Sequence, residues 1–110
     1  MTTEQRLNIV TEALDDLKAQ NIQTINVEHL TDMMENIVIC TATSTTHAKS
    51  LAKHLEAELK KNNISILGIE GEVKSDWVLV DTGDIVAHIM LEETRNLYAL
   101  EKLWDIKRKD

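Results

Sequence analysis

Several residue types are scarce in this sequence, and each scarcity excludes something. The 110 residues include no proline, no phenylalanine, three glycines, one tyrosine and one cysteine. With a single cysteine no internal disulfide can form, which fits a reducing compartment. Cys40 lies in the apolar run IVIC, so we expect a buried small side chain rather than a nucleophile. The core must be aliphatic, and the position of each aromatic residue is therefore informative.

Long apolar runs are also missing. No run approaches the ~20 residues that a membrane-spanning helix needs. The N-terminal MTTEQRLNIV lacks the basic and apolar regions of a signal peptide. We therefore expect a soluble, cytoplasmic protein. The length suits one domain with one core, and we expect this domain to extend over residues 1–104, followed by a short charged tail at 105–110.

Positive charge is in deficit. The chain has 19 Asp and Glu residues against 12 Lys and Arg, for a formal net charge of −7. Such a charge repels phosphate backbones, so we expect no DNA binding, and direct, affinity-driving contact with RNA is disfavoured as well. It suits a basic protein partner, although part of the excess can equally be the solvated surface of helices.

Hydrophobic spacing predicts an α/β fold. A helix is expected at 3–19, strands at 22–27 and 36–41, and a second helix between the caps at 43–46 and Asn62. Three strands follow at 64–69, 77–81 and 85–91, and a last helix runs from about 92 towards 104. The result is a mixed five-stranded sheet with helices packed on it. A crossover over residues 36–69 would supply its parallel pair, and the last two strands would form an antiparallel hairpin.

The stretch DWVLVDTGDIVAHIM at 76–90 forms this hairpin. A two-residue turn at Thr82-Gly83 would place Asp81 opposite Asp84 and Trp77 opposite His88. Alternation along the strands then gives two different faces. One is wholly aliphatic and carries Val78, Val80, Ile85, Ala87 and Ile89. The other carries Trp77, Leu79, Val86, His88 and Met90, and it is either a second core face under a helix or a surface for a partner.

An enzyme is the alternative interpretation of the same stretch. Asp81 and Asp84, with Glu70 and Glu72 in the preceding loop, would form a weak cation site if they approached one another. Aspartates beside a turn more commonly bond local backbone N–H groups. The cap TATSTTH has no glycine with which to cradle a phosphate, and His47 and His54 lie seven apart on one helix, too far for the usual zinc pair. We expect no catalytic residue, no metal and no cofactor.

Three segments, taken together, resemble the ribosomal silencing factor family, also called Iojap-like. They are ICTATSTTHAKSLA, GIEGEVKSDWVLVDTGDIVAHIM and LEETRNLYALEKLW, and the most specific pieces are EG-E-x3-DW, VD-x-GD-[IV]-x-x-H and E-x-R-x-x-Y-x-L-E-x-LW. The residues that match the family pattern are Glu70, Gly71, Glu72, Trp77, Asp81, Gly83, Asp84, His88, Glu93, Arg95, Tyr98, Leu100 and Trp104. The resemblance implies a nucleotidyltransferase-like fold without the catalytic motif.

The resemblance also implies a function. Members of this family are non-enzymatic translational repressors that bind the large ribosomal subunit through ribosomal protein L-fourteen. By doing so they block joining with the small subunit when nutrients are limiting. Carried onto this sequence, the contact would have an apolar centre and an acidic surround, with Arg95 either reaching the partner or bracing the site internally. The expected partner-binding residues are Trp77, His88, Met90, Tyr98, Glu70, Glu72, Glu93 and Arg95. We expect a monomer on the ribosome, with at most a peripheral contact to ribosomal RNA, and a homodimer of the free protein is left open. The rival class is a metal- or nucleotide-dependent enzyme using Asp81, Asp84 and Glu72.

Overall fold

A five-stranded mixed sheet forms the centre of the molecule, in a computed structural model that describes residues 1–99. The elements in chain order are α1 (Thr3–Asp16), β1 (Gln20–Asn26), β2 (Asn36–Ala42), α2 (Thr45–Lys61), β3 (Gly68–Glu70), β4 (Trp77–Asp81), β5 (Ile85–Leu91) and α3 (Glu92–Tyr98). The strands lie in the order β1-β2-β5-β4-β3. Only β2 and β5 are parallel neighbours, and the other pairs are antiparallel. The mixed α/β sheet predicted from the sequence is therefore confirmed.

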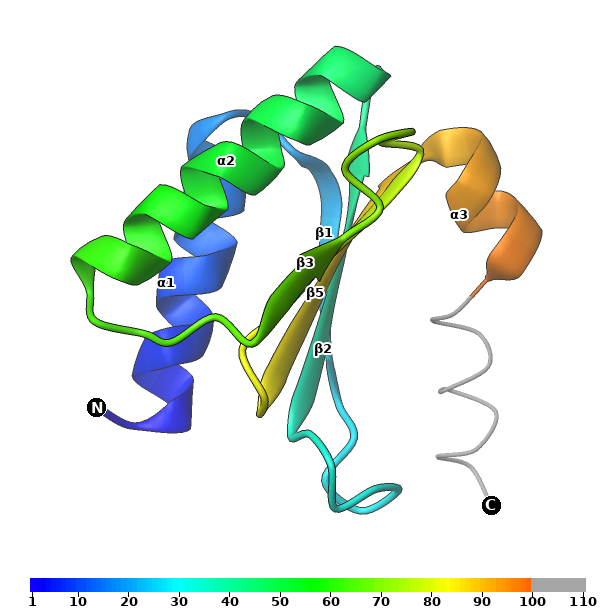
Figure 1. Ribbon diagram of the computed structural model, residues 1–110. Coiled ribbons are helices and arrows are strands. Elements are labelled where there is room, and N and C mark those ends of the chain that lie inside the picture. The colour runs from blue at the N-terminus through cyan, green and yellow to red at the C-terminus, as the bar shows by residue number, and fades with distance from the viewer. Residues whose placement is uncertain (100–110) are drawn as a thin grey trace.

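Two helices cover the first face of the sheet, where α1 and α2 lie side by side (Figure 1). Thr2 caps α1 and Ser44 caps α2, each by accepting a backbone N–H of the first turn. The buried stripe of α2 is Ala48, Leu51, Ala52, Leu55 and Leu59, as its spacing predicts. It packs with the aliphatic hairpin face, and Val78, Val80, Ile85, Ala87 and Ile89 all belong to this core.

Two histidines join α1 to α2. His47 accepts the Thr43 N–H at Nδ1, 2.9 Å away, so its Nε2 carries the proton and donates to the Leu17 carbonyl at 2.7 Å. His54 Nε2 lies 3.0 Å from Asp16 Oδ2. Both histidine side chains are partly exposed and therefore lie at the surface. Each also connects α1 to α2 through its hydrogen bond.

The second face of the sheet is covered from the other side by α3 (Figure 1). Ile25, Val27, Ile37, Ile39 and Met90 form a smaller buried cluster there, with Trp77 packed against it. The helix begins at Glu92, directly after β5, and ends at Tyr98, where Ala99 caps it in a left-handed conformation. The expected continuation of this helix towards Trp104, and the tail at 105–110, lie outside the described residues.

Three details differ from the sequence prediction. The first is the register of the hairpin, which pairs Trp77 with Met90 and Leu79 with His88. The Thr82 N–H and Oγ1 both donate to the Ile85 carbonyl, so the two-residue turn is Gly83-Asp84. The predicted pairs Asp81–Asp84 and Trp77–His88 are therefore wrong. The register moved by an even number of residues, so the composition of each face is unchanged.

The third strand is shorter than predicted. Residues 64–67 lie outside the strand, because β4 ends at Asp81 and its pairing with β3 begins only at Gly68. The predicted crossover does connect strands of the same direction, yet β3 lies at the far edge of the sheet and the parallel partner of β2 is β5. Among residues 1–99 no helix has the length and apolar character needed to cross a membrane.

Candidate functional site

Trp77 is the centre of the candidate site. It opens β4 on the second face of the sheet and is half-buried. Its indole Nε1–H donates to Nδ1 of His88 at 3.0 Å. The ring of Tyr98, on α3, lies with its centroid 4.7 Å from the Trp77 ring, tilted by 49°. The first residue of a strand and the last residue of α3 thus form one aromatic pair, in a geometry that favours ring contact.

His88 fixes the orientation of that indole from beneath. An indole nitrogen only donates, so His88 accepts at Nδ1 and must be neutral, with its proton on Nε2. The side chain is 9% exposed, and burial lowers the pKa of His88 from 6.5 to about 4. At neutral pH the imidazole is therefore an uncharged acceptor for Trp77.

Arg95 attaches α3 to the sheet. Its guanidinium donates to the Asn21 carbonyl at 2.7 Å, to Thr41 Oγ1 at 2.9 Å and to Gln23 Oε1 at 3.3 Å. It is 7% exposed, which is rare for arginine unless its donors are satisfied. Of the two roles left open for Arg95, the structure favours internal bracing, because the donors point at β1 and β2.

The acidic residues Glu70 and Glu72 flank Gly71, a position that no residue other than glycine can occupy without strain. Gly71 has φ +86°, and an added Cβ would lie 2.0 Å from the Trp77 carbonyl oxygen. The loop then closes through the Ser75 N–H to the Gly71 carbonyl, at 2.9 Å, and through Ser75 Oγ to the Glu72 carbonyl, at 2.6 Å. Glu70 pairs with Leu79 in the sheet and so shares the face of Trp77.

The accessible part of the site is formed mostly by α3. Leu97 and Tyr98 are 77% and 54% exposed, and Glu93 is exposed at the start of the same helix. Met90 is 0% exposed, so it supports Trp77 from the interior and presents no surface of its own. We use the name α3–Trp77 face for Glu70, Glu72, Trp77, Glu93, Leu97 and Tyr98.

The two aspartates at the hairpin turn do separate tasks. Asp81 Oδ1 accepts the Gly83 N–H at 2.8 Å, the local bond expected of a turn aspartate. Asp84 forms an ion pair with Arg6 of α1, and its carbonyl accepts the N–H groups of Glu35 and Asn36. Asp84 thereby holds α1, the turn and the start of β2 together. Sequence reasoning missed this pairing, since the partner lies 78 residues away and no local pattern signals it.

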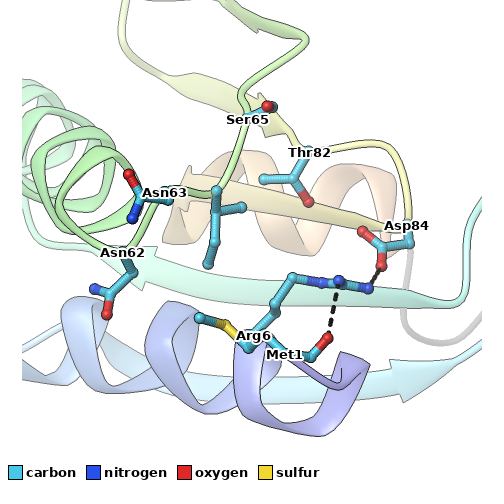
Figure 2. A pocket seen from close by; sticks show the side chains of 8 residues that line it. Met1, Arg6, Asn62, Asn63, Ser65, Thr82 and Asp84 are labelled. Carbon is cyan, nitrogen blue, oxygen red and sulfur yellow. Dashed lines mark hydrogen bonds and ion pairs between the residues drawn. The ribbon is translucent and has the colours of Figure 1, made fainter.

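A pocket of about 520 Å³ adjoins this ion pair (Figure 2). Arg6 and Asp84 are in direct contact and both line it, and the Arg6 guanidinium also donates to the Met1 carbonyl at 3.4 Å. Asn62, Asn63, Ile64, Ser65 and Thr82 complete the lining. Glu70 and Glu72 do not line it, and within residues 1–99 no three His, Cys, Asp or Glu side chains are arranged to hold a metal ion. The cation-site cluster considered from sequence is thus not assembled there.

Leu97 was not among the partner-binding residues expected from the sequence, yet it is a large apolar side chain exposed on α3. The prediction for Cys40 is confirmed: it is 0% exposed, and burial raises the pKa of its thiol to about 12, against a smaller opposing effect of Arg95.

The described residues form a mixed α/β domain, with a short helix docked on the second face of the sheet and the rings of Trp77 and Tyr98 in contact beside it. A sequence model described as "Ribosomal silencing factor during starvation" matches residues 1–110. A ribosomal silencing factor from Haemophilus influenzae is 39% identical over 93 residues, which cover 84% of this chain and 91% of that protein. The chain belongs to the ribosomal silencing factor family.

Two further comparisons agree. A crystal structure of a protein from Chromobacterium violaceum is similar with a TM-score of 0.94 at 34% identity, covering 96% of this chain and 88% of that one. A mouse protein named "Mitochondrial assembly of ribosomal large subunit protein 1" is 34% identical over 107 residues, which cover 94% of this chain and 47% of that protein. The resemblance stated from sequence motifs is confirmed.

Proposed function

We propose that this protein is a translational repressor that binds the large ribosomal subunit and prevents its joining with the small subunit. The contact is made through ribosomal protein L-fourteen and operates in the cytoplasm under nutrient limitation or in stationary phase. Membership of the ribosomal silencing factor family supports the ribosomal role. The printed name of the mouse relative, which refers to the large subunit, supports the choice of subunit.

The observation that carries the proposal is the exposed Tyr98 in contact with Trp77, with Leu97 exposed next to it on α3. Single exposed apolar side chains are common, but neighbouring large ones that form a patch mark interaction surfaces. Tryptophan and tyrosine are the residues that most often dominate the energy of protein interfaces. His88, Met90 and Arg95 act from behind this surface, since all three are buried and hold Trp77 and α3 in place.

Charge supports a basic partner at the same face. Glu70, Glu72 and Glu93 are exposed; Glu70 shares the sheet face of Trp77 and Glu93 lies in the first turn of α3. None of the three forms an ion pair among the described residues. Free carboxylates at the rim of an interface accelerate encounter with a basic protein and make binding sensitive to salt. We expect a faster association at low ionic strength.

The mechanism is steric exclusion. The folded body measures 38 × 34 × 21 Å, so a molecule docked on one subunit occupies space that the other subunit needs. No bond is made or broken, and the protein needs only to compete with subunit association. An interface of ~1,600 Å² would be of ordinary size for this purpose.

The enzyme alternative is tested by the same structure. It requires Asp81, Asp84 and Glu72 to converge, yet Asp81 bonds the turn and Asp84 pairs with Arg6. We therefore propose a non-enzymatic role. Calorimetry with Mg²⁺ and nucleoside triphosphates tests this role. Stoichiometric binding that is lost in Asp84→Asn would overturn it.

The proposed function is tested by sedimentation. Purified large subunits are mixed with the protein, and small subunits are then added at a Mg²⁺ concentration that supports joining. We expect the protein to migrate with the large subunit and the joined ribosome peak to decrease. Joining that is unaffected at saturating protein would contradict the proposal. Light scattering of the free protein separately tests self-association through the same face.

A further inference from the structure

Val73 has the most exposed large apolar side chain among residues 1–99, with 94% of its surface accessible. It lies in the turn of the loop 71–76, which connects β3 to β4. Single exposed apolar residues are common and carry little meaning by themselves. A valine at this place is nevertheless unusual, because turns favour Gly, Asn, Asp, Ser and Pro, whereas valine favours strands. Local preference therefore does not explain Val73, and such conflicts are typical of functional positions.

The loop around Val73 has a fixed shape. Ser75 is completely buried; its Oγ donates to the Glu72 carbonyl at 2.6 Å, and its N–H donates to the Gly71 carbonyl at 2.9 Å. Ser75 has φ +58° and Gly71 has φ +86°, and this left-handed conformation is costly for a residue with a side chain. Hydrogen bonds and burial thus hold the loop in one conformation, in which Val73 is exposed to solvent.

Both ends of the loop are fixed beside the α3–Trp77 face. At its start, a Cβ added to Gly71 would lie only 2.0 Å from the Trp77 carbonyl oxygen, so the two backbones are in direct contact. At its end, the Asp76 carbonyl accepts the N–H of Leu91, the residue before α3, at 3.0 Å. The loop and the start of α3 accordingly lie at the same end of the sheet (Figure 1). Val73 therefore stands at the border of the α3–Trp77 face.

We propose that Val73 is an additional apolar contact of this face and inserts into an aliphatic depression of the same ribosomal protein. This inference rests on the proposed function, because the loop adjoins the face proposed to bind the large subunit. Val73 lies between Glu72 and Lys74, whose opposite charges cancel. The turn thus offers no net positive charge to an RNA backbone, and its centre suits an apolar protein surface. An ordered loop also loses little conformational entropy on binding.

Binding of variants to purified large subunits tests the proposal. Val73→Thr keeps the branched shape and replaces one methyl group with a hydroxyl, which is costly to bury without a hydrogen bond; we expect about tenfold weaker binding. Val73→Ile, which stays apolar, should bind as tightly as the wild type. Leu67→Asn is the matched control, because Leu67 is 70% exposed at the opposite end of β3, beside Gly83. It should also bind as the wild type does, and all three variants should unfold at the wild-type urea concentration, since both positions are exposed.

Thiol labelling locates the contact directly. Because Cys40 is completely buried, Val73→Cys and Leu67→Cys each present one accessible thiol to a maleimide. The rate of labelling is followed by the mass of the protein, with and without saturating large subunits. We expect the subunits to suppress labelling at position 73 and to leave position 67 unchanged.

The outcomes separate this contact from the proposed function. Wild-type affinity of Val73→Thr, or labelling at position 73 that large subunits do not slow, would overturn the Val73 contact and leave the proposed function intact. Labelling at position 73 that slows in the concentrated free protein, without subunits, would assign the loop to a second copy of this chain and likewise overturn the contact. Failure of the wild type to bind large subunits would overturn both.

Discussion

Acidification should weaken the fold through His88, the buried acceptor beneath Trp77. Its pKa is about 4 in the folded protein against 6.5 in an unfolded chain. Between these values the unfolded state binds more protons, so stability falls as the pH falls. The contribution is complete above pH 6.5 and is lost as the pH approaches 4. Protonation would also remove the lone pair that accepts the Trp77 N–H.

The size of this effect follows from the difference between the two pKa values. One pKa unit is worth ~1.36 kcal/mol, so the full contribution is about 3 kcal/mol. About 2 kcal/mol of it is lost between pH 7 and pH 5. Carboxylates titrate in the same range, so the quantity to compare is the difference between the wild type and a variant that cannot titrate.

His88→Asn is that variant, since its amide oxygen can replace Nδ1 as the acceptor for Trp77. Urea unfolding of both proteins at pH 7, 6 and 5 gives the difference in unfolding free energy. We expect the wild-type advantage to shrink by about 2 kcal/mol over this range. A difference that stays constant with pH, or a His88 pKa near 6.5 measured by NMR titration, would refute a buried, neutral His88.

Other substitutions probe the supports of the site. Gly71→Ala should lower the unfolding free energy by more than about 2 kcal/mol, because a Cβ would collide with the Trp77 carbonyl and positive φ is costly; Gly68→Ala, with no atom within 4 Å, should change it by less than about 0.5 kcal/mol in the same urea experiment. Arg95→Met should cost about 2–3 kcal/mol in thermal unfolding, since it removes hydrogen bonds from a charged donor to β1 and β2; an unchanged midpoint would contradict the bracing role. Asp84→Asn should cost only about 0.5–1 kcal/mol, as its ion pair with Arg6 is partly exposed, and a loss that persists in high salt would show that the ion pair is not its cause.

Periodicity predicted most of the fold correctly. The buried apolar stripe of α2 and the alternating faces of the hairpin follow from residue spacing alone. The sequence therefore identifies their buried residues directly. Strand pairing is different, because register depends on which backbone groups close the turn. Thr82 and Gly83 both suit a turn, and only the bonds to the Ile85 carbonyl show that Gly83-Asp84 occupies its centre.

Long-range contacts explain the rest of the difference. The sequence marked Trp77, His88 and Tyr98 as a group through a family resemblance, and the structure brings their rings together. The sequence did not indicate that Arg95 reaches β1 and β2, or that Asp84 pairs with Arg6, because these partners are distant in the chain. Nor did it distinguish a surface Tyr98 from a fully buried Met90 on the same side of the sheet.

The central claim is that the α3–Trp77 face binds the large ribosomal subunit, and binding of a Tyr98→Ala variant tests it most directly. Tyr98 is 54% exposed, so the change should leave the fold intact, while Trp77→Ala provides a second, deeper truncation of the same face. Leu17→Ala, at the end of α1 on the opposite side of the sheet, is the matched control for loss of an exposed apolar side chain. We predict at least tenfold weaker binding to large subunits for Tyr98→Ala, about 1.4 kcal/mol, together with loss of the block on subunit joining, and wild-type behaviour for Leu17→Ala. Wild-type affinity in both Tyr98→Ala and Trp77→Ala would contradict the account.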